Sequence, residues 1–510
     1  MLLLSELQLD RAFNAIQYHG HGTFFPPPPE LATIASNWSA FRTELSRLDL
    51  DTYTGYEPCE MFAPKGRLNL RRVTQLHPYD LILYTALVME LRDSISESRL
   101  PPQQNRVFSH RADGVTTDIL YTPTPGYAEY KQRLKEIASA ADVLFGLTDI
   151  SDFYPRIYQH RLMNALLSAT KNTKANEIRC LEKMLYRFAN GASYGIPIGP
   201  LASRVLAEAV LIDVDSTLLM HDIDFVRFAD DYVIVGTKIE DVEFGIRTLA
   251  EVLFLNHGLT LQTAKTRVQN SAEYLESSES YEAKEAARRQ VIDVTGGGDY
   301  DDVEPLPYEE MTEDEQRDID ALNLSDMLED ALEGSDHIDY SEVSFILGRL
   351  SSLQEPDLIP IVLDNLEKLF PVAQSVAKFF SAFDRLEVTL RNQVADRLLT
   401  QIEEGSRASE FYAVWILNLF FEKRDWNHAT RLARIFTETQ SNSVRRYASL
   451  ALSTSGTRAE ALVAMRSFRS ALPLVRTSLL LASANLGRDE RKFTLRSLQL
   501  HDLLERTLAS

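Results

Sequence analysis

The stretch Phe225-Val226-Arg227-Phe228-Ala229-Asp230-Asp231-Tyr232-Val233-Ile234-Val235-Gly236 decides how this chain folds. Its apolar flanks, 225–228 and 232–236, predict β-strands, so Asp230 and Asp231 fall at the tip of a tight hairpin. Carboxylates beside buried strands are costly unless a cation compensates their charge. Taken alone, the tip has a second interpretation as an ordinary acidic turn, because aspartate is a favoured turn residue.

A third acid occurs in similar surroundings upstream. Val143-Leu144-Phe145-Gly146-Leu147-Thr148 predicts a buried strand, and Asp149 follows it directly. Three acids at adjoining strand ends are what two Mg²⁺ ions require to clamp an in-line phosphoryl transfer. The sequence therefore predicts that Asp149, Asp230 and Asp231 converge on a metal-dependent site.

Three further segments accompany the hairpin. In chain order the set reads Asp149-Ile150-Ser151-Asp152-Phe153-Tyr154-Pro155, Gly195-Ile196-Pro197-Ile198-Gly199-Pro200-Leu201-Ala202-Ser203, Phe228-Ala229-Asp230-Asp231, and His257-Gly258-Leu259-Thr260-Leu261 with Ala264-Lys265-Thr266. These segments resemble motifs A, B, C and D of reverse transcriptases, and they stand in the right order. Four ordered motifs are more specific than the acidic pair alone, so the chain is similar to reverse-transcriptase-type polymerases.

The resemblance implies catalytic roles for four residues. Asp149, Asp230 and Asp231 are expected to hold two Mg²⁺ ions, or Mn²⁺ in their place, with the Ile150 carbonyl as a further metal ligand. Lys265 matches the motif D lysine, whose ammonium group can protonate the leaving pyrophosphate. The alternative for Lys265 is an ordinary surface lysine.

The resemblance also implies a site for deoxynucleoside triphosphates (dNTPs). Tyr154 stands where the family places a ring under the sugar, and this ring would clash with a 2′-hydroxyl; the alternative is an ordinary core aromatic. Gly199 and Ser203 are expected near the incoming nucleotide, at the start of a helix that begins near Leu201. Four basic residues are expected to bind the triphosphate, with Arg71 at the family's arginine position: Lys65, Arg67, Arg71 and Arg72.

Composition fits an intracellular enzyme. The chain has 510 residues, enough for several domains, and 45% of them are hydrophobic. It contains no apolar run long enough for a membrane span, and its first residues lack a basic leader, so we expect no membrane contact and no signal peptide. Two cysteines without metal-ligand spacing suit a reducing, cytoplasmic location.

The net charge of −21 comes mostly from one segment. Residues 299–342 contain eighteen acids and one base, whereas 343–510 contain twenty-two bases and eighteen acids. The acidity is therefore compatible with a basic groove elsewhere. The acidic segment is expected to be a connector, and the alternative is a nucleic-acid mimic that covers a basic groove.

These observations predict an α+β fold with right-hand polymerase fingers and palm, followed by an all-α helical-repeat domain. The expected parts are an N-terminal extension (1–60), fingers (61–140), palm with motifs A–D (141–285), acidic connector (286–342) and α-helical repeats (343–510). The repeats are interpreted as HEAT-like, with a plain helical bundle as the alternative. Gly296-Gly297-Gly298 lacks a following Lys-Ser/Thr pair, which argues against a phosphate loop.

A compact polymerase followed by helical repeats resembles the abortive-infection (Abi) reverse transcriptases of bacteria and prophages. That resemblance implies phage defence, template-independent synthesis primed by the protein's own tyrosine, single-stranded DNA product, a homo-oligomer and a phage-encoded trigger. The candidate primers are Tyr18, Tyr53 and Tyr56, with Tyr18 favoured by its glycine-rich surroundings. Two alternatives stay open: a conventional RNA-templated reverse transcriptase of a retron-like or retroelement system, and a catalytically idle helical-repeat scaffold.

Overall fold

The computed structural model describes residues 1–66, 68–278, 324–333, 338–354, 356–383, 386–404 and 409–510. The chain forms two compact units, the first from residues 1–23, 34–58 and 74–282, and the second from 24–33, 59–73 and 283–510. The predicted fingers segment, 61–140, is thus divided between the two units. Most of the predicted acidic connector, including Gly296–Gly298, lies outside the described residues.

A four-stranded antiparallel sheet forms the centre of the first unit. Its order is β4-β5-β3-β6, made by β4 (Asp224–Phe228), β5 (Asp231–Gly236), β3 (Leu144–Asp149) and β6 (Arg267–Asn270). The two strands predicted around the Asp-Asp pair and the strand before Asp149 are therefore confirmed. Side chains alternate between the faces of the strands, so each strand contributes to two layers.

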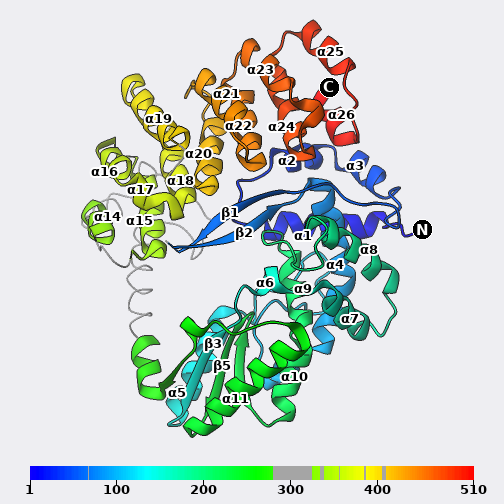
Figure 1. The fold of residues 1–510 in the computed structure, drawn as a ribbon, viewed down its shortest axis with the longest axis vertical. Coiled ribbons are helices and arrows are strands. Elements are labelled where there is room, and N and C mark those ends of the chain that lie inside the picture. Colours follow the sequence, from blue (N-terminus) through cyan, green and yellow to red (C-terminus); the bar gives the residue numbers. More distant parts are fainter. Residues whose placement is uncertain (67, 279–323, 334–337, 355, 384–385, 405–408) are drawn as a thin grey trace. The chain divides into compact units, whose positions relative to one another are not determined.

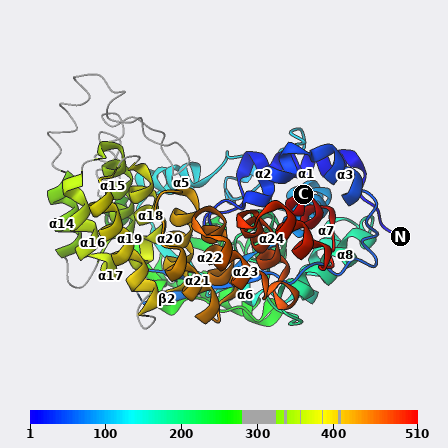
Figure 2. The same ribbon diagram turned by 90° about the horizontal axis from the view of Figure 1, so that it is seen from above.

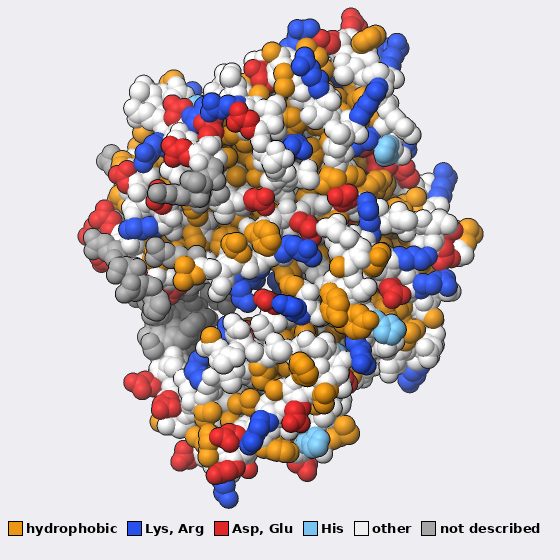
Figure 3. Space-filling model, in the orientation of Figure 1, with side chains coloured by type: hydrophobic (Ala, Val, Ile, Leu, Met, Phe, Trp, Pro, Cys, Tyr) orange, Lys and Arg blue, Asp and Glu red, His pale blue; other side chains and the backbone are white. Residues whose placement is uncertain are grey.

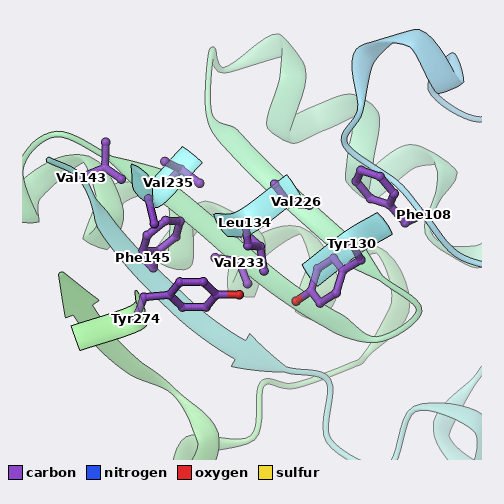
Figure 4. Packing of buried hydrophobic residues seen from close by; sticks show 10 residues of the cluster. Phe108, Tyr130, Leu134, Val143, Phe145, Val226, Val233, Val235 and Tyr274 are labelled. Atoms are coloured by element: carbon purple, nitrogen blue, oxygen red, sulfur yellow. The ribbon is translucent and has the colours of Figure 1, made fainter. Parts of the chain in front are cut away.

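One face of the sheet packs on α5 (Tyr127–Ala140) and on residues 271–278. Figure 4 shows Tyr130 and Leu134 of α5 against Val226 and Val233, with Tyr274 beside Phe145. Val226 and Val233 are direct partners in the β4–β5 ladder, which explains why they share this face.

The other face packs on α10 (Ile212–Met220) and α11 (Ile239–Val252), and α11 lies beside the sheet in Figure 1. Glu208 of α9 (Ala202–Val210) reaches this face and pairs with Arg227 of β4. Two glycines allow α11 to approach closely. A Cβ atom on Gly146 would lie 2.5 Å from Cγ1 of Val242, and one on Gly245 would lie 2.5 Å from Cγ2 of Ile234. Larger residues at these positions would push the helix off the sheet.

The remaining helices of the first unit surround α4 (Pro78–Ser98), which packs against α1, α7, α8 and α9. Pro78 stands in its first turn, where a missing amide hydrogen costs nothing, and the His77 ring accepts from the Tyr79 amide. The other elements are α1 (Glu6–His19), α3 (Trp38–Leu45), η1 (Pro102–Gln104), α6 (Phe153–Arg156), α7 (Gln159–Ala169), α8 (Ala175–Phe188), η2 (Leu253–His257) and η3 (Thr263–Lys265), and α2 (Pro29–Ser36) spans the boundary between the units.

The second unit joins a β-hairpin to a row of helices. The hairpin consists of β1 (Cys59–Lys65) and β2 (Asn69–Gln75), the last two residues of which belong to the first unit. The helices are α14 (Leu324–Glu333), α15 (Tyr340–Leu353), η5 (Pro356–Leu358), α16 (Ile359–Asp364), α17 (Leu366–Leu369), η6 (Phe370–Val372), α18 (Ala373–Ala382), α19 (Val388–Glu403), α20 (Glu410–Glu422), α21 (Ala429–Glu438), α22 (Asn442–Ser455), α23 (Arg458–Met465), η7 (Phe468–Ser470), α24 (Pro473–Ala482), η8 (Ser483–Asn485), α25 (Arg488–Arg496) and α26 (Leu503–Ala509).

Alternate helices of this row pack against one another in succession. α18 contacts α20, α20 contacts α22 and α22 contacts α24, as the row in Figures 1 and 2 shows. In the described part of 343–510 the predicted helical character is confirmed. None of the helices in the described part of the chain combines the length and apolar character that a membrane crossing requires.

Two N-terminal segments are built into the helical unit. β1 packs against α20 and α22, and the Ser443 hydroxyl donates to the Glu60 carbonyl over 2.9 Å. The second segment, residues 24–33, contains Glu30. This side chain is 0% exposed and accepts from the Arg446 guanidinium at 2.7 and 2.8 Å. The Tyr447 hydroxyl donates to the Pro26 carbonyl at 3.2 Å. The helical unit is therefore assembled from segments far apart in the sequence.

Candidate active site

The three predicted acids meet at one edge of the first unit's sheet. Asp149, at the end of β3, lies directly opposite Asp231, at the start of β5. Asp230 stands in the β4–β5 turn, and its carbonyl accepts from the Ile150 amide at 3.2 Å. Ala229, before it, has φ +51°, which gives the turn its sharp reversal. The convergence of Asp149, Asp230 and Asp231 is thus a property of the strand register.

The carboxylates of this cluster are crowded. Asp149 is 4% exposed and Asp230 is partly buried. Burial, followed by the charges of Asp149 and Asp231, raises the pKa of Asp230 from 3.8 to about 7. The ionised form of Asp230 is therefore disfavoured in the fold, first by burial and then by the two neighbouring negative charges.

Lys265 reaches the same cluster. Its Nζ lies 2.5 Å from Oδ2 of Asp149. The segment that carries it is fixed beside β3, because the Gln262 amide donates to the Asp149 carbonyl at 2.8 Å and the Thr148 and Thr266 hydroxyls are 2.8 Å apart. Burial opposes the charged ammonium, but the hydrogen bond and the charge of Asp149 outweigh it and raise the pKa of Lys265. The structure thus brings the predicted lysine to the acids.

Asp231 acts on several residues of α5. Burial, and after it the charge of Asp231, raises the pKa of Tyr127 and Tyr130, whereas burial lowers the pKa of Lys131 against the opposing effect of Asp231. As the side chains lie, the described residues contain no group of three or more His, Cys, Asp or Glu residues that could hold a metal. The donor set of Asp149 and Asp230 nevertheless fits a divalent cation, because two carboxylates are crowded together and burial and neighbouring negative charges raise the pKa of Asp230.

Motifs A and B are joined through the backbone around Tyr154. The Ile196 amide donates to the Tyr154 carbonyl at 3.1 Å, and the Gly195 amide to the Ile157 carbonyl at 2.8 Å. The Tyr154 side chain is half-buried, and burial raises its pKa, to which Asp230 contributes with a smaller effect. The sugar-contacting role of the Tyr154 ring stays a prediction.

Gly199 lies where two backbone segments approach closely. A Cβ atom on Gly199 would be 2.7 Å from the Thr74 carbonyl oxygen, and one on Gly22 would be 2.4 Å from the Gly199 carbonyl oxygen. The Thr74 amide donates to the Ile198 carbonyl at 2.8 Å. Glycine is needed here because any side chain would collide with backbone.

Ser203 lies in the first turn of α9 and faces α4. It is 1% exposed, and its hydroxyl shares a 2.9 Å hydrogen bond with the Tyr84 hydroxyl of α4. This bond ties α9 to α4. The predicted place of Ser203 near the incoming nucleotide stays a prediction.

The basic candidates of the predicted fingers belong to the second unit, whereas the acids belong to the first. Lys65 is exposed at the end of β1. The Arg71 guanidinium lies 5.5 Å from the centre of the Phe24 ring, and Arg72 is 3.5 Å from Glu60. Arg67 lies outside the described residues. The triphosphate-binding role of all four stays a prediction.

Two arginines near the acids were not predicted. Arg204 is exposed on α9, next to Ser203, and donates to the Tyr121 hydroxyl at 3.2 Å. Arg227 is completely buried in β4 and donates to the Ala229 carbonyl at 2.8 Å. The sequence could have singled out Arg227, because a charged residue inside an apolar strand must be paired with an opposite charge.

The comparisons with known proteins agree with the motifs. Residues 92–281 match the family model described as reverse transcriptase (RNA-dependent DNA polymerase). Among solved structures, the chain is similar to telomerase from Candida albicans in complex with a TWJ fragment of telomeric RNA (12% identity, 75% of this chain and 70% of that chain covered, TM-score 0.33). It is also similar to apo telomerase from Candida tropicalis (11% identity, 76% and 73% covered, TM-score 0.31). The search of curated proteins found no match. Residues 92–281 therefore match a reverse transcriptase domain, and this match supports a nucleotidyltransferase DNA polymerase of the reverse-transcriptase type.

Proposed function

We propose that the domain extends a DNA strand from dNTPs by metal-dependent nucleotidyl transfer at Asp149, Asp230 and Asp231. The observation that carries this proposal is the meeting of Asp149 and Asp230 with Lys265 at adjoining strand ends. Two divalent cations, Mg²⁺ or Mn²⁺, would be held by the three aspartates and the Ile150 carbonyl, and would neutralise phosphate charge and lower the pKa of the attacking hydroxyl. Lys265 would donate a proton to the departing pyrophosphate.

Selection of the nucleotide falls to residues around motif B. The Tyr154 ring would exclude the 2′-hydroxyl of a ribonucleotide. Gly199 would leave room for close backbone approach to the incoming base. Lys65, Arg67, Arg71 and Arg72 would supply positive charge for the triphosphate.

We further propose that the first nucleotide is attached to the protein itself, at Tyr18. Tyr18 is 62% exposed near the end of α1, and Gly20 and Gly22 after it have φ +79° and +101°. The closeness of Gly22 to Gly199 brings this loop to motif B within the first unit.

The other two tyrosine candidates are engaged in packing. The Tyr53 hydroxyl donates to Asp80 at 2.8 Å, and the ring of Tyr56 lies 4.1 Å from that of His77. Both would have to leave these contacts to act as a primer. These contacts favour Tyr18.

The proposed biological role is phage defence of the abortive-infection type. Its support is the combination of a reverse transcriptase domain with a row of helices whose alternate members pack in succession, as in HEAT-like repeats. On the face drawn in Figure 3, Lys and Arg side chains are interspersed with acidic and apolar ones. We propose that basic side chains of the helical unit guide a single-stranded DNA product, that the chain forms homo-oligomers, and that a phage-encoded factor triggers it in the cytoplasm.

The test is incubation of purified protein with Mg²⁺ and labelled dNTPs alone. We expect label that migrates with the protein on a denaturing gel and disappears after protease treatment. The Asp230→Asn variant should incorporate nothing. Incorporation only after an RNA template and a primer are supplied would instead support the conventional reverse transcriptase. Equal phage resistance from wild type and Asp230→Asn cells would support an idle scaffold.

The primer assignment needs its own comparison. Tyr18→Phe should abolish protein-linked label, whereas Tyr53→Phe and Tyr56→Phe should retain it. Addition of a DNA primer to Tyr18→Phe should restore synthesis, because the catalytic acids are unchanged. Protein-linked label in Tyr18→Phe would contradict the assignment and leave the polymerase reaction intact.

A further inference from the structure

Arg227 is the most completely buried charge near the acidic hairpin. It lies in β4 between Val226 and Phe228, both of which pack on the α5 face of the sheet. Alternation along the strand therefore directs Arg227 to the opposite face, toward α9 and α10. A guanidinium with 0% exposure requires hydrogen-bond partners for its donors.

The guanidinium has partners on three elements. Its Nε and Nη2 donate to Asp215 of α10 at 2.9 and 2.6 Å. Its Nη1 donates to Glu208 of α9 at 3.0 Å and to the Ala229 carbonyl at 2.8 Å. Arg227 thus connects the helix that follows motif B with the turn that carries Asp230.

Glu208 is itself fixed from a separate part of the chain. Arg99 lies 2.9 Å from its Oε2, and the Ser109 hydroxyl donates to Oε1 at 2.6 Å. Arg99 also donates to the Ser109 carbonyl at 2.7 Å. Burial opposes ionisation of Glu208, but Arg227 and then Arg99 lower its pKa, so it stays charged. The Glu208 carboxylate that accepts from Arg227 is therefore itself held by Arg99 and Ser109.

The hydrogen bond to Ala229 has a particular consequence. Ala229 has φ +51°, a conformation that costs a non-glycine residue energy and must be held by its surroundings. Its carbonyl belongs to the peptide bond that leads into Asp230. Rotation of that peptide would turn the Asp230 side chain away from Asp149.

We propose that Arg227 is a positioning residue for nucleotidyl transfer: through the Ala229 carbonyl it holds Asp230 in the orientation that a divalent cation shared with Asp149 requires. The inference rests on the proposed metal-dependent function. It adds that the helix after motif B, through Glu208, determines the metal affinity of motif C. Arg227 itself touches neither nucleotide nor metal.

The test is the Arg227→Lys variant, which keeps the charge and loses the guanidinium fork. We expect the Kd for Mn²⁺, measured by calorimetry or by the electron paramagnetic resonance of free Mn²⁺, to rise at least tenfold. In the incorporation assay the half-saturating Mg²⁺ concentration should rise in parallel, while the KM for dNTP should change less than twofold. The matched control is Arg106→Lys, because Arg106 contacts Asp224 at the exposed start of the same strand and should leave both values unchanged.

A second variant separates positioning from stability. Ala229→Gly in the Arg227→Lys background relaxes the backbone strain and should recover part of the Mn²⁺ affinity. If Arg227→Lys lowers the melting temperature and leaves Mn²⁺ affinity and Mg²⁺ dependence as in wild type, Arg227 is structural and the proposal is wrong.

A third variant is available if Arg227→Lys does not fold. Glu208→Gln retains the shape of the side chain but loses the charge that pairs with Arg227. It should therefore raise the Kd for Mn²⁺, as Arg227→Lys does. Unchanged Mn²⁺ binding in a folded Glu208→Gln variant would also overturn the proposal. Wild-type protein that binds Mn²⁺ through Asp230 and incorporates no nucleotide would contradict the proposed function alone.

Discussion

The Lys265 ammonium group and the Asp149 carboxylate are in direct contact at 2.5 Å, with the lysine side chain 52% exposed and the aspartate side chain 6% exposed. The lysine thus reaches from the solvent side into the acidic cluster and neutralises part of its charge. A divalent cation that binds Asp149 competes with this contact. Under the proposed function, Lys265 would therefore act both on cation binding and on proton transfer to pyrophosphate.

Replacement of Lys265 by glutamine should separate these effects. We expect the half-saturating Mg²⁺ concentration to fall several-fold, because the competing ammonium is gone. The maximal rate of incorporation should fall by about 10²-fold, the usual contribution of a general acid. A Mg²⁺ titration of the incorporation rate measures both. Lys265→Arg retains the positive charge and should leave the Mg²⁺ dependence close to wild type. Equal rates in Lys265→Gln and wild type would exclude the proton-donor role.

The raised pKa of Asp230 predicts a pH dependence of cation binding and of stability. Its pKa is about 7 in the fold against 3.8 for an ordinary aspartate, so protonation is favoured in the folded state. Without metal, the free energy of unfolding should therefore decrease as pH rises from about 4 through about 7. Mg²⁺ affinity should increase over the upper part of the same interval, because the cation requires the ionised carboxylate.

Thermal unfolding at pH 5 and pH 8, with and without Mg²⁺, measures this linkage. The melting temperature of Asp230→Asn should change less between pH 5 and pH 8 in the absence of metal, and Mg²⁺ should raise it only slightly. A wild-type melting temperature that rises steadily from pH 5 to pH 8 without metal would contradict the prediction.

Truncation of the Tyr154 ring should relax sugar selection. Tyr154→Ala should raise the incorporation of ribonucleotides relative to deoxynucleotides by about 10- to 200-fold, the range expected when a steric contact of this size is lost. Tyr154→Phe retains the ring and should discriminate like wild type. Competition between labelled ribonucleotides and deoxynucleotides gives the ratio. An unchanged ratio in an active Tyr154→Ala variant would place the sugar contact elsewhere.

The buried pair of Glu30 and Arg446 should be essential to the helical unit. Both side chains are 0% exposed, so Arg446→Met leaves an unpaired carboxylate and should destabilise the fold by about 3–5 kcal/mol. The double variant Glu30→Leu/Arg446→Met removes both charges and should regain much of that loss. Chemical denaturation followed by circular dichroism measures the difference. A double variant no more stable than Arg446→Met would show that packing, and not charge, dominates at this position.

The sheet and the acidic cluster were predictable because they depend on local patterns. Apolar runs on both sides of Asp230 and Asp231 specify two strands and a turn, and the antiparallel register then brings Asp149 opposite Asp231. Lys265 followed from motif order. None of these inferences depended on knowing tertiary contacts between distant segments beforehand.

The orientation of side chains on α9 was not predictable. A helix start near Leu201 fixes which residues begin the helix, but tertiary packing against α4 decides that Ser203 faces inward and Arg204 outward. Likewise Arg227 is one charge in an apolar strand, and its partners Glu208 and Asp215 come from two helices that the strand pattern does not mark.

The alternation of the chain between its two units has a consequence for deletion experiments. Residues 24–33 and 59–73 belong to the helical unit, and the chain returns to the first unit after each of them. It enters the helical unit for the last time after residue 282. A shortened polypeptide that stops before the helices would retain β1 and Glu30. The buried side chains of Cys59 and Met61 would then be exposed to solvent, and Glu30 would lose its ion pair with Arg446. Loss of activity on such truncation would report misfolding of interleaved segments, so point substitutions are the proper means of dissecting what each unit contributes.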